Sequence, residues 1–244
     1  MNNNQTIERL KAMRLTAMAE LHTLNIANNT YQKNTADEYL SLLTDCEWED
    51  RQNKKIKRLH QKAGFKQQAD VNEVTFSEYR NLDRNMFDRL ATLQFIKQKE
   101  NIIITGAAGV GKSFLSQALG RKACMFGYAT IYQVTARLLN RMKLAKLDGT
   151  YDKELKKITM AKLLIIDDFG LQRLDNTTRE ILLDIIDERY NQASCIISSQ
   201  LPVSAWYDII GEGTIADAIL DRVVNSSHRI ELKGDSMRKG MLNQ

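Results

Sequence analysis

The sequence predicts an α/β fold, in which helices flank a parallel β-sheet, preceded by a small all-α N-terminal domain. Short apolar runs at 102–104, 163–166 and 195–197 are typical of strands buried on both faces, as in parallel sheets. Segments with apolar residues at helical spacing separate these runs. Residues 1–69 carry helical patterns alone, so we place the α/β domain at 70–244.

The N-terminal domain is expected to contain two main helices. Apolar residues recur at spacings of three to five over 5–25, which predicts one amphipathic helix. Thr35 precedes Glu38 by three residues, the spacing of a capping box, so a second helix should begin there. We expect Trp48, on this second helix, to pack in the core. Gly64 marks the domain boundary, and the domain is expected to bind DNA or to mediate oligomerisation.

The composition limits the kinds of protein that this chain can be. The chain has 244 residues, of which 43% are hydrophobic and 27% charged, enough to bury a full core. Its three cysteines, Cys46, Cys124 and Cys195, form no C-x-x-C pair, which favours reduced thiols in the cytoplasm. The N-terminus lacks the apolar core of a signal peptide, and no stretch approaches the roughly 18 apolar residues of a membrane span. We therefore expect a soluble, cytoplasmic protein that does not bind membranes.

Basic residues form two clusters on expected helices. The net charge of +5 and the pI near 9.0 favour a polyanionic partner. One cluster lies between residues 51 and 66, where no acidic residue occurs, and the other between 137 and 146. We interpret both as contacts for DNA phosphates, with a solvated helix face as the alternative for the first. The residues concerned are Lys54, Lys55, Arg58, Arg137, Arg141, Lys143 and Lys146.

The stretch G-A-A-G-V-G-K-S at 106–113 matches the phosphate-binding pattern G-x-x-x-x-G-K-[ST] at every fixed position. It follows an apolar run and precedes an expected helix at 114–126, which is the strand, loop and helix order that this P-loop requires. Glycine permits the backbone angles with which N–H groups surround a phosphate. Lys112 is then expected to contact the β- and γ-phosphates during catalysis, and the Ser113 hydroxyl to bind Mg²⁺. The predicted nucleotide-binding residues are Gly106, Ala107, Ala108, Gly109, Val110, Gly111, Lys112, Ser113 and Phe114.

Another strand, expected over 162–168, ends in two carboxylates. Ligands bind at the carboxyl edge of parallel sheets, so this strand should deliver Asp167 and Asp168 to the P-loop. Asp167 is the candidate for holding Mg²⁺, through water, opposite Ser113, and Asp168 for polarising the attacking water. The alternatives are a helix cap for Asp167 and a surface charge for Asp168.

A buried strand expected at 195–200 ends in uncharged polar groups. Thr177 and Glu180 have the spacing of a capping box for the helix that precedes it. At the end of the strand, Ser199 or Gln200 could hydrogen-bond the γ-phosphate or its water. The alternative is a polar strand end that meets solvent.

Arg222 lies near the end of a helix expected at 215–224. Its neighbour Asp221 points about 100° away on the helix, so the two do not form an ideal local ion pair. An arginine in this place can reach the nucleotide of an adjacent subunit and stabilise the charge that develops during phosphoryl transfer. We therefore predict that Arg222 is catalytic in trans, the alternative being a surface arginine.

Together these motifs resemble an AAA+ ATPase and, more narrowly, the IstB family of insertion-sequence helper ATPases, which are relatives of the helicase loader DnaC and the initiator DnaA. The resemblance covers nearly the whole chain. Besides the P-loop it rests on L-L-I-I-D-D-F-G-L at 163–171, S-S-Q-L-P-V at 198–203, T-I-A-D-A-I-L-D-R-V-V at 214–224 and H-R-I-E-L-K-G-D-S-M-R-K at 228–239.

The resemblance implies an ATP-hydrolysing, Mg²⁺-dependent protein that oligomerises on double-stranded target DNA and delivers it to its partner transposase. It places Ser199 in the sensor-I region, matches Arg222 to the arginine finger, and likens Arg238 to a sensor-II arginine at the ATP site. The helix at 137–146 corresponds to an inserted element that lines a DNA channel in the DnaA and DnaC relatives. The chain departs from the family pattern in two ways: Asp168 replaces the usual glutamate, which implies slow hydrolysis, and no separate C-terminal lid domain fits after Arg222.

Three other functions fit parts of this pattern. A helicase loader of the DnaC type would engage a hexameric helicase and prefer single-stranded DNA. A P-loop kinase of small molecules would need neither Arg222 nor assembly. A scaffold that binds ATP without useful turnover is compatible with Asp168 in place of glutamate.

Overall fold

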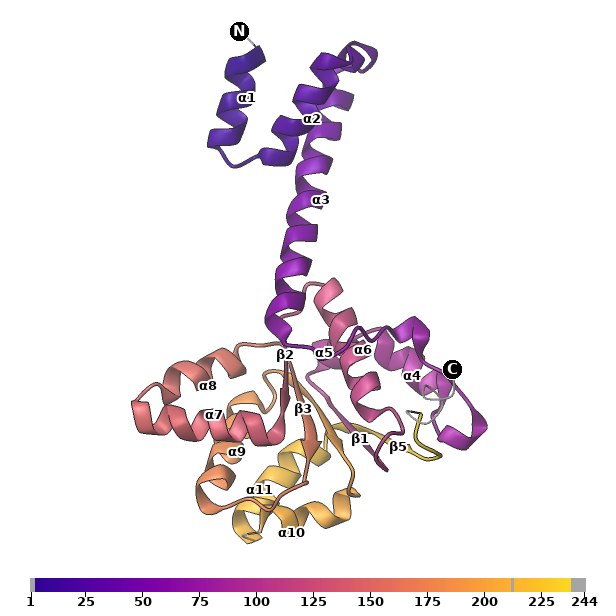
Figure 1. Cartoon of the computed structure of the whole chain (residues 1–244), viewed down its shortest axis with the longest axis vertical. Coiled ribbons are helices and arrows are strands. Elements are labelled where there is room, and N and C mark those ends of the chain that lie inside the picture. The colour runs from indigo at the N-terminus through magenta and orange to yellow at the C-terminus, as the bar shows by residue number, and fades with distance from the viewer. Residues whose placement is uncertain (1–2, 212, 238–244) are drawn as a thin grey trace. The chain divides into compact units, whose positions relative to one another are not determined.

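The computed structural model describes residues 3–211 and 213–237, and the chain divides into two compact units, 1–58 and 59–244 (Figure 1). The described part of the first unit is helical, and the second unit contains the β-sheet. Helix α3 (Ala36–Ala63) begins in the first unit and ends in the second.

The first unit contains α1 (Asn3–Ala12), α2 (Thr16–Ala27), the short 3₁₀ helix η1 (Thr30–Lys33) and most of α3. The prediction of one helix over 5–25 is wrong, because Arg14 adopts a left-handed backbone angle (φ 61°) that ends α1. The Glu47 carboxylate of α3 accepts hydrogen bonds from the N–H groups of Ala17 and Met18, at 3.0 and 3.2 Å. A carboxylate from a distant helix therefore caps the start of α2.

The start of α3 confirms the predicted capping box. The Glu38 carboxylate accepts a hydrogen bond from the Thr35 N–H at 2.7 Å, and the Thr35 hydroxyl accepts one from the Glu38 N–H at 3.3 Å. The expectation that Trp48 lies in the core is wrong, since it is 65% exposed. Leu43 and Glu47 form the buried stripe of this part of α3, and Trp48 points about 100° away from Glu47.

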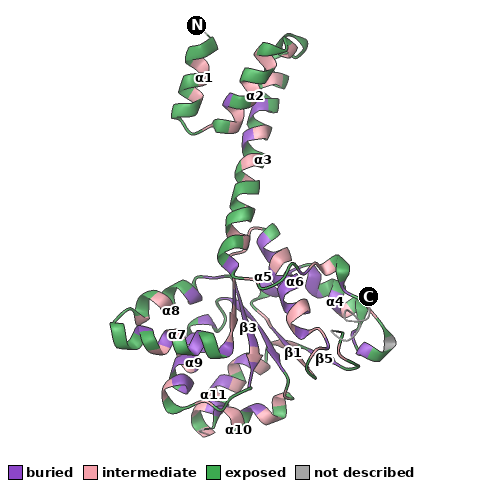
Figure 2. Cartoon of the chain, viewed as in Figure 1, coloured by how far each residue is buried: buried purple, intermediate pink, exposed green. Residues whose placement is uncertain are grey.

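The second unit is built on a five-stranded parallel sheet with the strand order β2-β3-β4-β1-β5. Strands β3 and β4 are buried along almost their whole length and β1 is buried at its centre, Ile102 to Ile104 (Figure 2), as expected of a sheet covered on both faces. This confirms the predicted α/β fold with a parallel sheet. The strands are β1 (Asn101–Gly106), β2 (Thr130–Val134), β3 (Leu163–Phe169), β4 (Ser194–Ser199) and β5 (Ser227–Leu232).

Helices cover both faces of this sheet (Figure 1). Ile102 and Ile104 of β1 pack in the cluster that includes α4, α5 and α6, whereas Ile103 packs with α7 to α11, because successive strand side chains point to opposite faces. No helix in the described ranges is long and apolar enough to cross a membrane. The helices are α4 (Arg84–Ala91), α5 (Gln94–Gln98), α6 (Lys112–Met125), α7 (Thr135–Asp148), α8 (Tyr151–Thr159), α9 (Asn176–Arg189), α10 (Trp206–Ile210) and α11 (Gly213–Val224), with short 3₁₀ turns η2 (Val71–Glu73), η3 (Glu78–Arg80) and η4 (Val203–Ala205).

Two local features differ from the sequence prediction. Helix α9 is capped by Asp175 rather than by Thr177, because the Asp175 carboxylate accepts the Thr178 N–H at 2.9 Å and the helix begins at Asn176. Strand β5 was not predicted. It lies at the edge of the sheet, and only Ile230 and Leu232 are buried in it, so it lacks the continuous apolar run that identified β1, β3 and β4.

The Asp175 cap should make stability depend on pH. The Lys143 ammonium, at 2.6 Å, and the amide and hydroxyl of Thr178 lower the pKa of Asp175 from 3.8 to about 2. A depressed pKa in the folded state stabilises the protein above the unfolded pKa, and this stabilisation disappears as the pH falls through about 2. We expect Asp175→Asn to lower the free energy of unfolding at pH 7 and to match the wild type progressively between pH 4 and pH 2, as measured by urea denaturation. The exposed Asp217 of α11 provides the control, because Asp217→Asn should show no such convergence.

Candidate nucleotide-binding site

The P-loop joins the carboxyl end of β1 to the start of α6. Two of its glycines are required by their surroundings and by positive φ angles. A side chain at Gly106 (φ 145°) would collide with the carbonyl oxygen of Leu232 on β5. A Cβ at Gly111 (φ 98°) would lie 2.7 Å from the guanidinium of Arg80. The loop is therefore packed closely between β5 and the segment that precedes α4.

Lys112 lies over this loop. Its side chain is buried, and Nζ donates hydrogen bonds to the carbonyl oxygens of Gly106 at 2.8 Å and Ala107 at 2.7 Å. Carbonyl dipoles stabilise the ammonium without neutralising its charge. The ammonium is thus held at the start of α6, where the helix dipole also favours a negatively charged ligand.

The Ser113 hydroxyl donates a hydrogen bond of 3.0 Å to Oδ1 of Asp167, at the end of β3. The structure thus brings together the two residues that the sequence assigns to Mg²⁺. Both supply oxygen atoms, which Mg²⁺ prefers, and Asp167 adds a negative charge. The donor set therefore fits this cation, with the carboxylate acting directly or through water.

Asp167 is almost fully buried and is surrounded by donors. Oδ2 accepts a 2.6 Å hydrogen bond from the Tyr132 hydroxyl of β2, and Oδ1 accepts further bonds from the Ser198 hydroxyl of β4 and from the Asp168 N–H. Burial and the neighbouring Asp167 raise the pKa of Tyr132, so its hydroxyl stays a donor. The sequence analysis did not predict the contacts of Tyr132 and Ser198 with Asp167. Both residues lie on strands adjacent to β3, so these contacts could be predicted only with knowledge of the strand order.

Asp168 and Ser199 have different surroundings from those of Asp167. Asp168 has a left-handed backbone (φ 56°) at a register shift between β3 and β4, and it lines a pocket of about 180 Å³ beside α7. The Ser199 hydroxyl donates to the Phe169 carbonyl at 2.7 Å and accepts the Leu201 N–H at 3.1 Å. Both hydrogen bonds of the Ser199 hydroxyl are therefore made with backbone groups, whereas the Ser198 hydroxyl contacts the Asp167 carboxylate.

Arg80 of η3 is a further residue that the sequence did not reveal. It is 8% exposed, and its Nη2 donates to the carbonyl oxygen of Val110 in the P-loop at 3.1 Å. Its Nη1 donates to the carbonyl oxygen and, at 3.0 Å, to the hydroxyl of Thr75. Burial lowers the pKa of Arg80. The guanidinium thus fastens the segment before α4 to the loop.

A groove of about 1000 Å³ lies beside the start of the P-loop. Leu82 and Met86 line it on one side and the end of β5, through Lys233 and Gly234, on the other. Gln200, at the end of β4, also lines it. The predicted nucleotide-binding residue Arg238 lies outside the described residues.

Comparison with known proteins agrees with this geometry. The sequence profile of the family described as "IstB-like ATP binding protein" matches residues 8–244. The chain belongs to this family. It is 41% identical to the putative insertion sequence ATP-binding protein y4pL of Sinorhizobium fredii over 96% of both chains. It is 35% identical to the putative ATP-binding protein of insertion sequence IS1162 of Pseudomonas fluorescens, over 84% of this chain and 89% of the relative.

Solved structures show that this IstB-like chain has the AAA+ fold of replication proteins. DnaI superposes with a TM-score of 0.59 at 19% identity, covering 68% of this chain and 92% of DnaI. DnaA of Aquifex aeolicus, bound to the nucleotide analogue AMPPCP, superposes with a TM-score of 0.57 at 17% identity, covering 74% of this chain and 56% of DnaA. The chain is thus an IstB-like ATP-binding protein whose fold resembles that of DnaI and DnaA.

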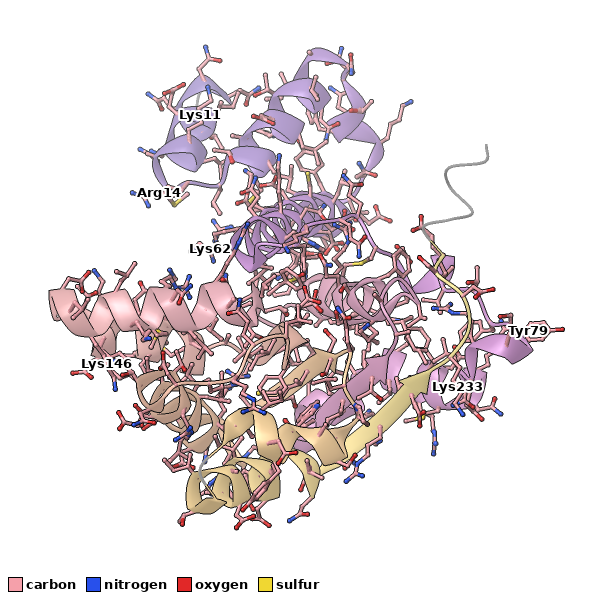
Figure 3. All side chains as sticks on the ribbon, turned by 60° about the horizontal axis from the view of Figure 1, so that its bottom comes forward. Lys11, Arg14, Lys62, Tyr79, Lys146 and Lys233 are labelled. Carbon is pink, nitrogen blue, oxygen red and sulfur yellow. The ribbon has the colours of Figure 1, made fainter. Side chains whose placement is uncertain are left out.

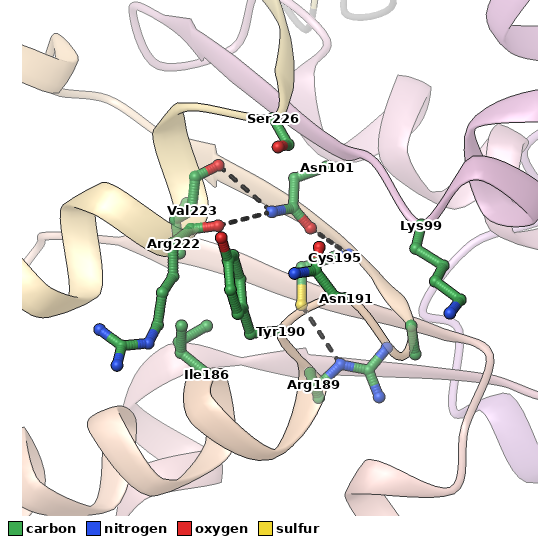
Figure 4. Close-up of a pocket in the computed structure, with 11 residues that line it drawn as sticks. Lys99, Asn101, Ile186, Arg189, Tyr190, Asn191, Cys195, Arg222, Val223 and Ser226 are labelled. Carbon is green, nitrogen blue, oxygen red and sulfur yellow. Dashed lines mark hydrogen bonds between the residues drawn. The ribbon is translucent and has the colours of Figure 1, made fainter.

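Arg222 lies beside Asn101, at the end of the sheet where β1 begins (Figure 4). Asn101, the first residue of β1, donates hydrogen bonds to the carbonyl oxygens of Arg222 and Val223, whereas the P-loop follows the last residue of β1. The Arg222 guanidinium pairs with Asp187 of α9 at 2.5 Å and lies 5.9 Å from the centre of the Tyr190 ring. Its side chain is 30% exposed.

The basic residues predicted to bind DNA fall into two groups. On α7, Lys146 is visible at the periphery in Figure 3, and it pairs with Glu180 at 3.6 Å. Arg141 and Lys143 pair with Glu154 and Asp175, and Lys54 of α3 pairs with Asp50. No ion pair within the described ranges involves the exposed residues Arg137, Lys55 and Arg58. These three retain an uncompensated charge.

Replacing Arg80 should loosen the P-loop. Lysine keeps the charge but cannot reproduce the planar fork that contacts both Thr75 and Val110. Loss of one charged hydrogen bond at the loop corresponds to a reduction in ATP affinity of about tenfold. We expect this reduction in Arg80→Lys, measured with a fluorescent ATP analogue. Arg84→Lys on α4 is the control, because Arg84 contacts Asp88 and Phe76 instead of the loop; equal affinities of the two variants would contradict the assignment.

Proposed function

We propose that this protein is an ATP-hydrolysing helper of transposition, which assembles on duplex target DNA and delivers it to its partner transposase. The hydrogen bond between Ser113 and Asp167 is the observation that supports this most, because it pairs the two expected Mg²⁺ ligands of a P-loop ATPase. The relatives named as ATP-binding proteins of insertion sequences support transposition over a small-molecule kinase.

ATP would lie along the loop between β1 and α6. The phosphates would accept hydrogen bonds from N–H groups at the start of α6, and Lys112 would turn its donors from the carbonyls of Gly106 and Ala107 to phosphate oxygens. The groove beside Gly106 is large enough for the nucleoside. Mg²⁺, bound by Ser113 and Asp167, would neutralise part of the negative charge of the phosphates.

Asp168 is proposed to orient the water that attacks the γ-phosphate. It directly follows Asp167, and its backbone leaves the regular strand at that point. Its side chain is one methylene shorter than that of glutamate, so the carboxylate must act from farther away. Hydrolysis is therefore expected to be slow, and ATP would act mainly to hold the assembly together.

Assembly would complete the catalytic site. Arg222 lies at the edge of the sheet opposite the P-loop, so it cannot act on the ATP bound by its own chain. A neighbouring subunit that presents this edge to the P-loop would place Arg222 near the γ-phosphate. The exposed part of its guanidinium is available for that contact.

The trans role of Arg222 can be separated from its contact with Asp187. We expect Arg222→Ala to leave the monomer folded and able to bind ATP, but to lower turnover about a thousandfold and to weaken ATP-driven assembly. Light scattering with ATP, with ADP and with duplex DNA measures assembly, and phosphate release measures turnover.

Asp187→Ala is the matched control, because it breaks the same ion pair but keeps the arginine. Lys112→Ala should abolish the response to ATP altogether. If Asp187→Ala and Arg222→Ala lost activity equally, Arg222 would be a structural residue. If the wild type stayed monomeric with ATP and duplex DNA, the proposed function would be wrong.

Binding to DNA is proposed to depend mainly on interactions with phosphates. Arg137 and Lys143 lie on the same helix, but Lys143 already pairs with Asp175 at 2.6 Å. A cation without a carboxylate partner gains more from a phosphate, because it has no ion pair to give up.

Arg137→Ala should therefore weaken binding more than Lys143→Ala does. The slope of log affinity against log salt concentration should fall by about 0.9 for each phosphate that the variant no longer neutralises. Fluorescence anisotropy with duplex and single-stranded DNA of equal length measures both effects. Equal weakening in the two variants would argue against this choice of residues, and a preference for single strands would favour a helicase loader.

A further inference from the structure

We propose that Tyr132 is a positioning residue that fixes the orientation of the Asp167 carboxylate for Mg²⁺ binding. This inference rests on the proposed ATPase function and adds a residue of β2 to the cation site. The Tyr132 hydroxyl donates to Asp167 and not to a residue of the P-loop, so Tyr132 would act on the cation through Asp167.

The sheet register brings Tyr132 to Asp167. Strands β2 and β3 are parallel neighbours, with Tyr132 opposite Ile165 and Val134 opposite Asp167. Tyr132 and Asp167 are thus on the same face of the sheet, two positions apart along the strands. A phenol is long enough to bridge this offset, and its hydroxyl reaches Oδ2 of Asp167 at 2.6 Å.

The two carboxylate oxygens of Asp167 are held differently. Oδ1 accepts hydrogen bonds from Ser113, Ser198 and the Asp168 N–H, whereas Tyr132 is the donor to Oδ2 among the described residues. Rotation about the Cβ–Cγ bond moves both oxygens together, so a donor at each oxygen restricts this rotation more tightly than donors to Oδ1 alone. The bond from Tyr132 supplies the restraint at Oδ2.

Cation binding would make the hydrogen bond from Tyr132 to Oδ2 more important. With Mg²⁺ at this site, the Ser113 hydroxyl would serve the cation as well as Asp167, whereas Tyr132 and Ser198 would serve Asp167 alone. Tyr132 and Ser198 then remain as the side-chain donors that orient the carboxylate. Hydrogen-bond partners of metal-binding carboxylates typically contribute 10- to 100-fold to metal affinity.

The ring of Tyr132 is itself held in place. It is 3% exposed, its centre lies 6.4 Å from that of Phe65, and Nζ of Lys66 lies 5.9 Å above it. Phe65 and Lys66 belong to the segment that follows α3 within the second unit. The direction of the hydroxyl is therefore set by packing, as a positioning role requires.

The test is Tyr132→Phe, which removes the hydroxyl and keeps the ring. ATP affinity is measured with a fluorescent analogue in EDTA and in Mg²⁺, and their ratio gives the enhancement by Mg²⁺. We expect this enhancement to fall about tenfold or more, with the affinity in EDTA unchanged. In phosphate release, the Mg²⁺ concentration for half-maximal rate should rise, while saturating Mg²⁺ should restore the rate.

Tyr151→Phe is the matched control. The Tyr151 hydroxyl also donates to a carboxylate, that of Asp184 at 2.5 Å, but this pair joins α8 to α9 away from the P-loop. The control should lose stability without any change in the Mg²⁺ enhancement. Phe65→Leu weakens the packing of the Tyr132 ring and keeps the hydroxyl. It should shift the enhancement in the same direction as Tyr132→Phe but by less, and it replaces Tyr132→Phe as the test if that variant does not fold.

The outcomes separate this inference from the proposed function. A wild type whose ATP binding responds to Mg²⁺, together with an unchanged enhancement in Tyr132→Phe, would overturn the role of Tyr132 alone. An unchanged enhancement in Phe65→Leu, where Tyr132→Phe cannot be prepared, would do the same. A wild type that binds ATP without any response to Mg²⁺ would overturn both.

Discussion

The hydrogen bond between Ser113 and Asp167 joins two parts of the chain that are 54 residues apart, and the arrangement of the nucleotide site depends on it. It forms because β1, β4 and β3 are parallel neighbours, so their carboxyl ends meet at one edge of the sheet. Helix α6 lies across these strands and brings Ser113 to the end of β3. The order of the strands thus determines which side chains surround the P-loop.

The basic side chains of the second unit have two kinds of hydrogen-bond partner, backbone carbonyls and carboxylates. Lys112 and Arg80 donate to backbone carbonyls around the P-loop. On α7, by contrast, Arg141, Lys143 and Lys146 pair with carboxylates of the same unit. These pairs join α7 to α8 and to the start of α9, and they lower the net positive charge of the surface around α7. The basic pI of the chain therefore overstates the charge of this helix surface.

The positions of Arg222 and the P-loop explain why the proposed activity would depend on assembly. They occupy opposite edges of one sheet, and the length of β1 separates them. A rigid sheet cannot bring its two edges together. Under the proposed function, another copy of the chain would supply the arginine, which would link hydrolysis to the assembly of subunits. This arrangement also means that the contact with Asp187 can be altered without touching the nucleotide site.

The sequence by itself determined the features that depend on local pattern. Three consecutive isoleucines predicted β1, the glycine spacing identified the P-loop, and the carboxylates at the end of β3 identified Asp167. The capping box of Thr35 and Glu38 could also be predicted, because both of its hydrogen bonds lie within four consecutive residues. The family followed from these motifs, because their order along the chain is specific.

Only the tertiary structure decided which residues meet across the fold. Tyr132 and Ser198 contact Asp167 through the strand order, and Arg80 contacts the loop through a segment about thirty residues upstream. The break between α1 and α2 depends on Glu47, a capping residue that lies 30 residues from Ala17. Contacts of this kind are set by the packing of distant segments, for which a local sequence pattern carries no signal. The position of the P-loop could thus be predicted from the sequence, whereas the residues that hold it in place could not.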